Sequence, residues 1–119
     1  PYTTAADYRA WVEAQAGRED PRFYAIIDSA TGKAGGVASY MRIDPANGCI
    51  EVGGIKLTPL VSRRPAMTEA MHLMMKNAFG LGYRRYEWKC DALNAPSRAA
   101  ARRLGFSFEG IFHQAVIYK

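Results

Sequence analysis

Residues Asn94–Phe106 read NAPSRAAARRLGF and carry the signals of a short helix at both ends. Asn94 can accept a hydrogen bond from the first free N–H groups of a helix, and a proline is tolerated in the first turn. Arginines near the end complement the helix dipole, and Gly105 suits the position just beyond the last turn. Ser97 lies on the same face as Leu104, so the stretch predicts a helix with a hydroxyl at the inner edge of its N-terminus.

This placement of Ser97 gives the helix start a candidate binding role. Free N–H groups and the positive end of the helix dipole favour anionic ligands. From the residues alone, however, the simpler interpretation of Ser97 as an ordinary first-turn serine is favoured. A binding role needs support from the rest of the chain.

The segments around this helix predict a mixed sheet. Thr4 and Asp7 resemble a capping box that begins a helix over Ala5–Ala16, and Pro65 suits the start of a long helix ending at Gly80 or Gly82. Alternating or apolar runs predict strands at 23–28, 35–43, 49–57 and 84–92, the first two as an antiparallel hairpin, with a closing strand or bent hairpin over 106–119. Strands that alternate with long helices after an initial meander imply an α/β fold with helices covering the sheet.

The strand at 49–57, CIEVGGIKL, changes the parity of its apolar residues. Ile50 and Val52 share one face of an extended strand. The later apolar pair, Ile55 and Leu57, falls on the opposite face. A β-bulge at the two intervening glycines would bring both pairs to one face, and a simple bend at the glycines is an equally good interpretation.

Composition and charge limit the class of protein. A chain of 119 residues, 49% of them hydrophobic, can bury one core, so residues 1–119 are expected to form a single domain. No apolar run approaches the length of a membrane span. Cys49 and Cys90 lie in strand-like runs, which favours buried thiols, a reducing compartment and a cytoplasmic location over a disulfide framework. The net charge of +5 favours an anionic partner without identifying it.

Three stretches resemble, in order and spacing, the acetyl-CoA-dependent GNAT superfamily of acetyltransferases. Residues 94–110, NAPSRAAARRLGFSFEG, are similar to the second cofactor-contacting motif of that superfamily, in which an Asn-x-x-Ser helix start leads to Leu-Gly-Phe and a strand. Residues 84–93 and 50–71 fit the same family. The similarity covers most of the chain from Phe23 onward and is closest to the ribosomal-protein N-terminal (alanine/serine) acetyltransferases.

The resemblance implies the acyl-CoA N-acyltransferase fold, a mixed and largely antiparallel sheet with helices on both faces. The chain begins at Pro1 and ends in a strand-like run, so we expect a partial GNAT domain without the first strand and helix and without the last strand. In the family, a bulged strand splays away from the next one and opens a cleft for the pantetheine arm of acetyl-CoA. Here the backbone of Ile55, Lys56 and Leu57 would line that cleft.

The loop before the long helix departs from the family pattern. Family members usually place glycines there, and their N–H groups hold the pyrophosphate, whereas residues 62–67 read SRRPAM. Pro65 removes one donor, while Arg63 and Arg64 supply two cations able to bind phosphate. The alternative is a solvated arginine pair on a degenerate loop, as in a pseudoenzyme. The resemblance implies acetyl-CoA contacts by Ile55, Lys56, Leu57, Arg63, Arg64, Ala66, Met67, Asn94, Ser97 and Arg102.

Acetyl transfer requires a deprotonated amine and a proton for the departing thiolate. By resemblance, Glu51 would act as the base through a water molecule, and Ser97 would hydrogen-bond the thiolate sulfur. A solvent-facing position for Glu51 remains an equal alternative, with Glu87 and Asp91 as fallback bases. His72 and His113 are interpreted as structural, and no metal site is expected.

The expected function is transfer of an acetyl group from acetyl-CoA to a primary amine. A protein N-terminus is the preferred acceptor by resemblance, and a small-molecule amine such as an antibiotic is the second. The alternatives are a non-catalytic GNAT-like binding module and, least favoured, a nucleic-acid-binding domain. A helix-turn-helix needs a helix before residue 94, but residues 84–92 alternate like a strand. No membrane partner is expected, and a homodimer stays open.

Overall fold

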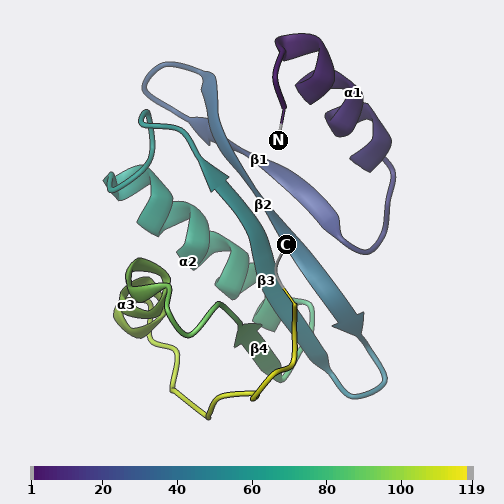
Figure 1. Ribbon diagram of the computed structural model, residues 1–119, viewed down its shortest axis with the longest axis vertical. Helices are drawn as coiled ribbons and strands as arrows, with labels where there is room; N and C mark the ends of the chain where they lie inside the picture. The colour runs from purple at the N-terminus through teal and green to yellow at the C-terminus, as the bar shows by residue number, and fades with distance from the viewer. Residues whose placement is uncertain (1, 118–119) are drawn as a thin grey trace.

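The computed structural model describes residues 2–117, in which three helices cover the two faces of one four-stranded sheet (Figure 1). The observed order of helix, three strands, helix, strand and helix is the one that the sequence predicts up to residue 105. The elements are α1 (Ala5–Gln15), β1 (Arg22–Asp28), β2 (Lys33–Asp44), β3 (Cys49–Leu57), α2 (Pro65–Gly80), β4 (Arg85–Trp88) and α3 (Ala95–Arg103).

The sheet is mixed, with the strand order β1-β2-β3-β4. The first three strands form an antiparallel meander, and β4 lies parallel to β3 after the crossover through α2. This confirms the predicted fold class. Residues of α2, together with Leu104 and Phe106 just after α3, pack against one face. Trp11 of α1 packs edge-on against Phe23, which lies on the other face. No helix within residues 2–117 has the length and apolar character needed to cross a membrane.

The main core lies between the sheet and α2. Ile26, Ala38 and Val52 from the three antiparallel strands are buried against Met67 and Met71. Ala78 is also buried, whereas Met74 and Met75 of the predicted apolar face are half-buried. Methionine suits this surface because its flexible side chain fills irregular gaps between a helix and a twisted sheet. The helix therefore has the predicted inner face.

A β-bulge interrupts β3 at the glycines. Val37 pairs with Lys56 and Ser39 pairs with Gly53, so β3 advances three residues while β2 advances two. Gly54 has a φ of +59°, a conformation that a residue with a side chain adopts at a cost. The bulge interpretation is thus confirmed over the simple bend.

The bulge restores one buried face along the strand. Val52 before it is buried in the core, and Ile55 and Leu57 after it pack against the same cluster. Without the extra residue the later pair would face the opposite side of the sheet. The close packing on that opposite side also selects glycine, since a Cβ atom at Gly54 would lie 3.0 Å from atoms of both Phe23 and Ser39.

β4 is shorter than predicted, because it ends at Trp88 rather than continuing to residue 92. The last parallel pair is Val52 with Trp88, directly before the bulge. Beyond this point β3 turns away, and residues 89–92 have no neighbouring strand to pair with. The expectation that Cys90 is a buried strand thiol is therefore wrong: it is exposed in the loop, while Cys49 is half-buried in β3.

The predicted closing strand or hairpin is absent from residues 106–117, and residues 118–119 of that prediction lie outside the described residues. Phe106 packs against the core, but Phe108 and Phe112 are 77% and 76% exposed, so burial does not hold the segment beyond Phe106 against the sheet. The Arg85 guanidinium of β4 donates two hydrogen bonds to the carboxylate of Glu109, which lies in this segment. A strand also requires a ladder of backbone hydrogen bonds, and alternation of apolar residues alone does not supply a partner.

The first helix begins as predicted and ends at Gln15, one residue early. The Thr4 hydroxyl accepts from the Asp7 N–H at 3.1 Å, and the Asp7 carboxylate accepts from the Thr4 N–H at 3.0 Å. These reciprocal bonds form the predicted capping box. On the inner side of the helix, the Lys56 ammonium lies 4.3 Å from the centre of the Trp11 ring.

Candidate active site

A cleft of about 530 Å³ lies where β3 and β4 separate. One wall is the bulged part of β3, another is the end of β4 with the loop after it, and α2 and α3 form the floor. The two strands are paired from Cys49 with Arg85 to Val52 with Trp88 and no further. The lining residues are Val52, Gly53, Gly54, Ile55, Met67, Trp88, Lys89, Cys90, Asp91, Asn94, Ser97 and Ala100.

The opening leaves backbone groups of β3 free on the cleft side. From Gly53 to Leu57, β3 pairs with β2 along one edge, while the other edge has lost β4. Unpaired N–H and C=O groups at a strand edge can bind an extended chain that carries amide groups. The bulge thus creates a binding edge inside the sheet.

Ser97 and Trp88 join the two sides of this cleft. The Trp88 indole N–H donates to the Ser97 hydroxyl oxygen at 3.1 Å. Since the indole is the donor, the hydroxyl proton of Ser97 remains for another acceptor. Asn94 holds the helix start as predicted, because its side-chain oxygen accepts from the Ser97 backbone N–H at 3.1 Å.

The N-terminus of α2 has no side-chain cap, unlike those of α1 and α3. Arg64 occupies the cap position, and Pro65 follows in the first turn. Arg63 has a φ of +56°, a left-handed conformation that glycine usually provides. The loop thus has a glycine-like turn without a glycine, and both arginines are exposed beside an uncapped helix start.

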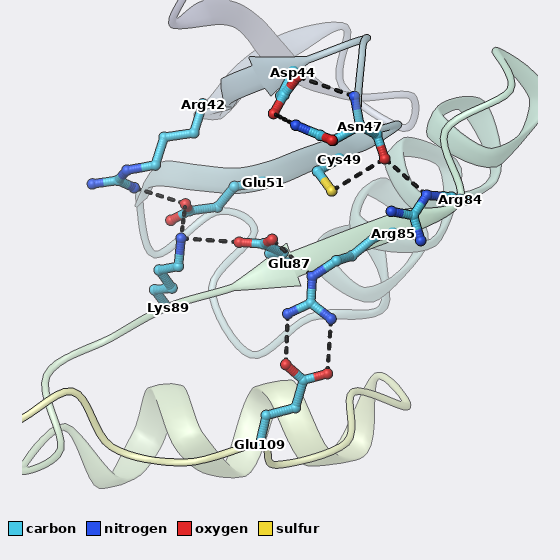
Figure 2. A network of polar contacts seen from close by, with 10 residues as sticks. All are labelled: Arg42, Asp44, Asn47, Cys49, Glu51, Arg84, Arg85, Glu87, Lys89 and Glu109. Carbon is cyan, nitrogen blue, oxygen red and sulfur yellow. Dashed lines mark hydrogen bonds and ion pairs between the residues drawn. The ribbon is translucent and has the colours of Figure 1, made fainter.

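Glu51 is buried and paired with two cations (Figure 2). Its residue is 3% exposed, so the alternative of a solvent-facing carboxylate is wrong. One of its oxygens accepts from Arg42 Nη1 at 2.7 Å and from Lys89 Nζ at 3.1 Å. A buried carboxylate normally requires such partners, because an unpaired buried charge is costly.

The ion pairs continue from Glu51 to the outer edge of β4. Lys89 Nζ lies 2.9 Å from Glu87, whose other oxygen accepts from Arg85 Nε at 2.9 Å. Hydrogen bonds from Lys89 and then Arg85 hold the pKa of Glu87 below its ordinary value. Burial alone would lower the pKa of Lys89, but its hydrogen bonds to Glu87 and Glu51 outweigh burial and raise it. Both shifts favour the charged forms of Glu87 and Lys89.

A second bulge directs Arg42 toward Glu51. The register of β2 advances three residues from Met41 to Asp44 while β3 advances two, and Arg42 has a φ of +46°. The Asp20 carboxylate accepts from the backbone N–H groups of Arg42 and Ile43, at 3.1 and 3.0 Å. This loop carboxylate thus holds the bulge from outside the strand.

The structure brings four of the predicted contact residues to the cleft, namely Ile55, Met67, Asn94 and Ser97. Six others do not line it, namely Lys56, Leu57, Arg63, Arg64, Ala66 and Arg102. The Lys56 ammonium lies over the Trp11 ring of α1 instead, and Arg102 is exposed in the last turn of α3. Their contacts with acetyl-CoA stay predictions.

Sequence reasoning missed Trp88, Lys89 and Arg42 as site residues. In the sequence, Trp88 is one residue of a strand-like alternation over residues 84–92, and this alternation gives no sign that the strand ends there. Arg42 reaches Glu51 through a bulge that no glycine marks. The proximity of Lys89 to Glu51 could have been inferred only from the pairing of β3 with β4.

Within residues 2–117, no group of three or more His, Cys, Asp and Glu side chains is placed to hold a metal ion. His72 is exposed on α2, and His113 is exposed after α3. The segment before α3 is the parallel strand β4 and its loop, so α3 does not belong to a helix-turn-helix.

The family model described as an acetyltransferase (GNAT) domain matches residues 1–107. The chain belongs to the GNAT acetyltransferase family. No curated protein matches it.

Solved structures of several acetyltransferases share this fold, among them the following three. A GCN5-related N-acetyltransferase from Brucella melitensis is 53% identical, with a TM-score of 0.95 over 100% of this chain and 54% of that one. A probable GNAT-family acetyltransferase from Chromobacterium violaceum is 39% identical, with a TM-score of 0.90 over 100% and 60%. An acetyltransferase from Salmonella typhimurium that modifies the N-terminal serine of a 50S ribosomal subunit protein is 27% identical, with a TM-score of 0.82 over 99% and 69%. The chain thus spans between half and two thirds of the first two structures it matches.

Proposed function

We propose that the protein is an N-acetyltransferase that moves the acetyl group of acetyl-CoA to a primary amine. The observation that carries the proposal is the free edge of β3 opposite Ser97, at the point where β4 ends. Membership of the GNAT family supports the same reaction. The cleft offers backbone hydrogen bonds along one wall and a hydroxyl on the other.

The chemistry of acetyl-CoA fits these groups. The pantetheine arm carries two amides, which can pair with the free backbone of β3 as a further strand does. Its phosphates are anionic, and the uncapped N-terminus of α2 offers N–H groups with two arginines beside them. Arg63 and Arg64 would hold the phosphates from this end.

The reaction forms a carbon–nitrogen bond and breaks the carbon–sulfur bond of the thioester. The deprotonated amine attacks the thioester carbonyl carbon, and the tetrahedral adduct collapses to the acetylated amine and the CoA thiolate. The Ser97 hydroxyl can donate to the leaving sulfur, since its oxygen already accepts from Trp88. The ammonium proton of the acceptor leaves to Glu51, directly or through water, once that carboxylate is accessible. The second proton of the amine nitrogen passes to the CoA thiolate as the adduct collapses.

A protein N-terminal amine is the proposed acceptor. The ribosomal-protein serine acetyltransferase from Salmonella typhimurium supports this choice, because it aligns over 99% of the chain at 27% identity. A small-molecule amine is the alternative outcome of the same experiment.

The test uses the full-length protein in two stages. A thermal-shift titration compares acetyl-CoA with ATP and duplex DNA as polyanion controls. Acetyl-CoA at 100 times its dissociation constant adds about 2.7 kcal/mol to stability. A shift specific to acetyl-CoA supports the cofactor assignment, whereas equal responses to all three polyanions, or none, contradict it.

The second stage measures transfer by mass spectrometry. Peptides with free N-terminal serine or alanine are compared with the same peptides blocked at the N-terminus, and with an aminoglycoside. We expect a mass increase of one acetyl group on the free peptides alone. Binding of acetyl-CoA without transfer to any amine would instead indicate a non-catalytic GNAT-like module.

A further inference from the structure

The Lys89 ammonium lies between two carboxylates at the edge of the cleft (Figure 2). Its Nζ atom is 3.1 Å from Glu51 and 2.9 Å from Glu87. Each carboxylate also has an arginine partner, Arg42 for Glu51 and Arg85 for Glu87. The two acids therefore keep a cation each if Lys89 leaves, and the ammonium site between them would become vacant.

Lys89 differs from the two arginines in its position. Of the three cations, only Lys89 lines the cleft. It follows directly after the last residue of β4, in a loop that pairs with no strand. Its side chain is 40% exposed, so the ammonium can move into water without unfolding the sheet. The Glu51 side chain it would uncover is 4% exposed.

The Lys89 ammonium is chemically the same group as the protonated acceptor amine of the proposed reaction. A protonated primary amine carries three N–H donors on an alkyl carbon, as the lysine side chain does. We propose that Lys89 occupies the acceptor ammonium site of the free protein, and that the acceptor displaces it to bind between Glu51 and Glu87. This inference rests on the proposed function and specifies where its acceptor amine binds.

The same contacts define the form in which an acceptor would bind. Hydrogen bonds to Glu87 and Glu51 outweigh burial and raise the pKa of Lys89, so the site favours an amine in its protonated form. A protonated amine has no free lone pair, so the acceptor binds here as an ammonium and reacts only after it has passed its proton to Glu51. Lys89 is thus a positioning residue that keeps the carboxylate pair neutralised until an acceptor arrives.

The test removes the side chain and supplies an amine in its place. Lys89→Ala vacates the site, and n-propylammonium replaces the lost end of the chain. At ten times its dissociation constant the amine should raise the unfolding midpoint of the full-length variant by about 3–6 °C. The wild type should shift less, because Lys89 competes for the site.

Three controls separate specific binding from a general salt effect. Tetramethylammonium has the same charge without N–H donors and should not stabilise the variant. Lys89→Met fills the space with an uncharged chain and should not respond to propylammonium. Lys76→Ala removes an exposed lysine on α2 and should behave like the wild type.

Kinetics supply the second measurement. Lys89→Ala should lower the acceptor KM about tenfold with kcat little changed, because the acceptor no longer displaces a bound ammonium. Propylammonium should then compete with the acceptor and not with acetyl-CoA. Equal thermal shifts for Lys89→Ala and Lys76→Ala, or a loss of kcat at unchanged KM, would overturn the inference. If wild-type protein neither binds acetyl-CoA nor acetylates amines, the proposed function fails instead, and the thermal shifts still decide the ammonium site.

Discussion

The indole of Trp88 donates a hydrogen bond to the hydroxyl oxygen of Ser97, with 3.1 Å between the two atoms. Trp88 is the last residue of β4, and Ser97 lies in the first turn of α3. The bond therefore orients the hydroxyl from the side of the strand. Its proton remains available on the side of the cleft.

Replacement of Ser97 tests its role at the leaving sulfur. We expect Ser97→Ala to reduce kcat about 10–100-fold, because a hydrogen bond to a charged group contributes roughly 1.5–3 kcal/mol. Trp88→Phe should have a smaller effect, since it frees the hydroxyl to rotate without removing it. Steady-state kinetics and acetyl-CoA titration of both variants supply the measurement. Unchanged kcat in Ser97→Ala would leave Ser97 as a structural first-turn serine.

The role of the bulge at Gly54 can be tested by comparing two glycine-to-alanine variants. Gly54→Ala adds a Cβ that lies 3.0 Å from Phe23 and Ser39 atoms and also strains a φ of +59°. We expect a loss of about 1–3 kcal/mol in stability together with weaker acetyl-CoA binding, because the free edge of β3 shifts. Gly32→Ala is the control, with a similar φ of +70° and no atom within 4 Å of the new Cβ. Gly32→Ala should lose stability without losing affinity for acetyl-CoA. Equal losses of acetyl-CoA affinity in Gly32→Ala and Gly54→Ala would contradict the role of the bulge in binding.

Two variants of Arg63 distinguish the effect of backbone strain on stability from the effect of its charge on acetyl-CoA binding. Arg63→Gly should raise stability by about 1 kcal/mol, since glycine adopts a positive φ without steric cost. Arg63→Ala keeps the strain and should not stabilise the protein. Both variants lose the cation, so we expect acetyl-CoA affinity to fall several-fold, with a weaker dependence on salt. Titrations at low and high ionic strength measure this, and unchanged affinity would favour a solvated surface arginine.

The carboxylate of Glu87 should affect acid stability. Its pKa is lowered by hydrogen bonds from Lys89 and then Arg85. Its contribution is therefore fully present above its unfolded pKa of about 4.3 and is lost as the pH falls through the lower folded value. Glu87→Gln should destabilise the protein at pH 7, and the difference from wild type should narrow below about pH 4. Urea unfolding between pH 3 and pH 7 checks this, with Glu69→Gln as a control at an exposed carboxylate on α2.

The sequence predicted a feature correctly where that feature depends on interactions between residues close together in the chain. Asn94 and the Thr4–Asp7 pair predicted helix starts that the structure confirms, because a cap depends on neighbours within four residues. The parity change in residues 50–57 indicated the bulge for a similar reason, since the alternation of side chains has a fixed period of two. The resemblance to the GNAT family implied the cleft that this bulge opens.

Predictions failed where an element depends on a distant partner. Residues 89–92 alternate like a strand, yet β4 ends at Trp88 because β3 turns away at its bulge. The segment after Phe106 has strand-like residues and no ladder among the described residues. Propensity describes how a residue fits a sheet and does not provide the neighbouring strand.

By itself, the sequence determined the class of fold, the capped helix that carries Ser97, and the glycines that permit the break in β3. Only the tertiary structure decided that Glu51 is buried between Arg42 and Lys89, and that Trp88 meets Ser97. Caps and alternation follow from interactions within a few residues of the chain, which the sequence displays directly. The cleft and the ion pairs beside it follow from strand register and from a bulge at Arg42 that no local signal marks, so they appear only once the sheet is assembled.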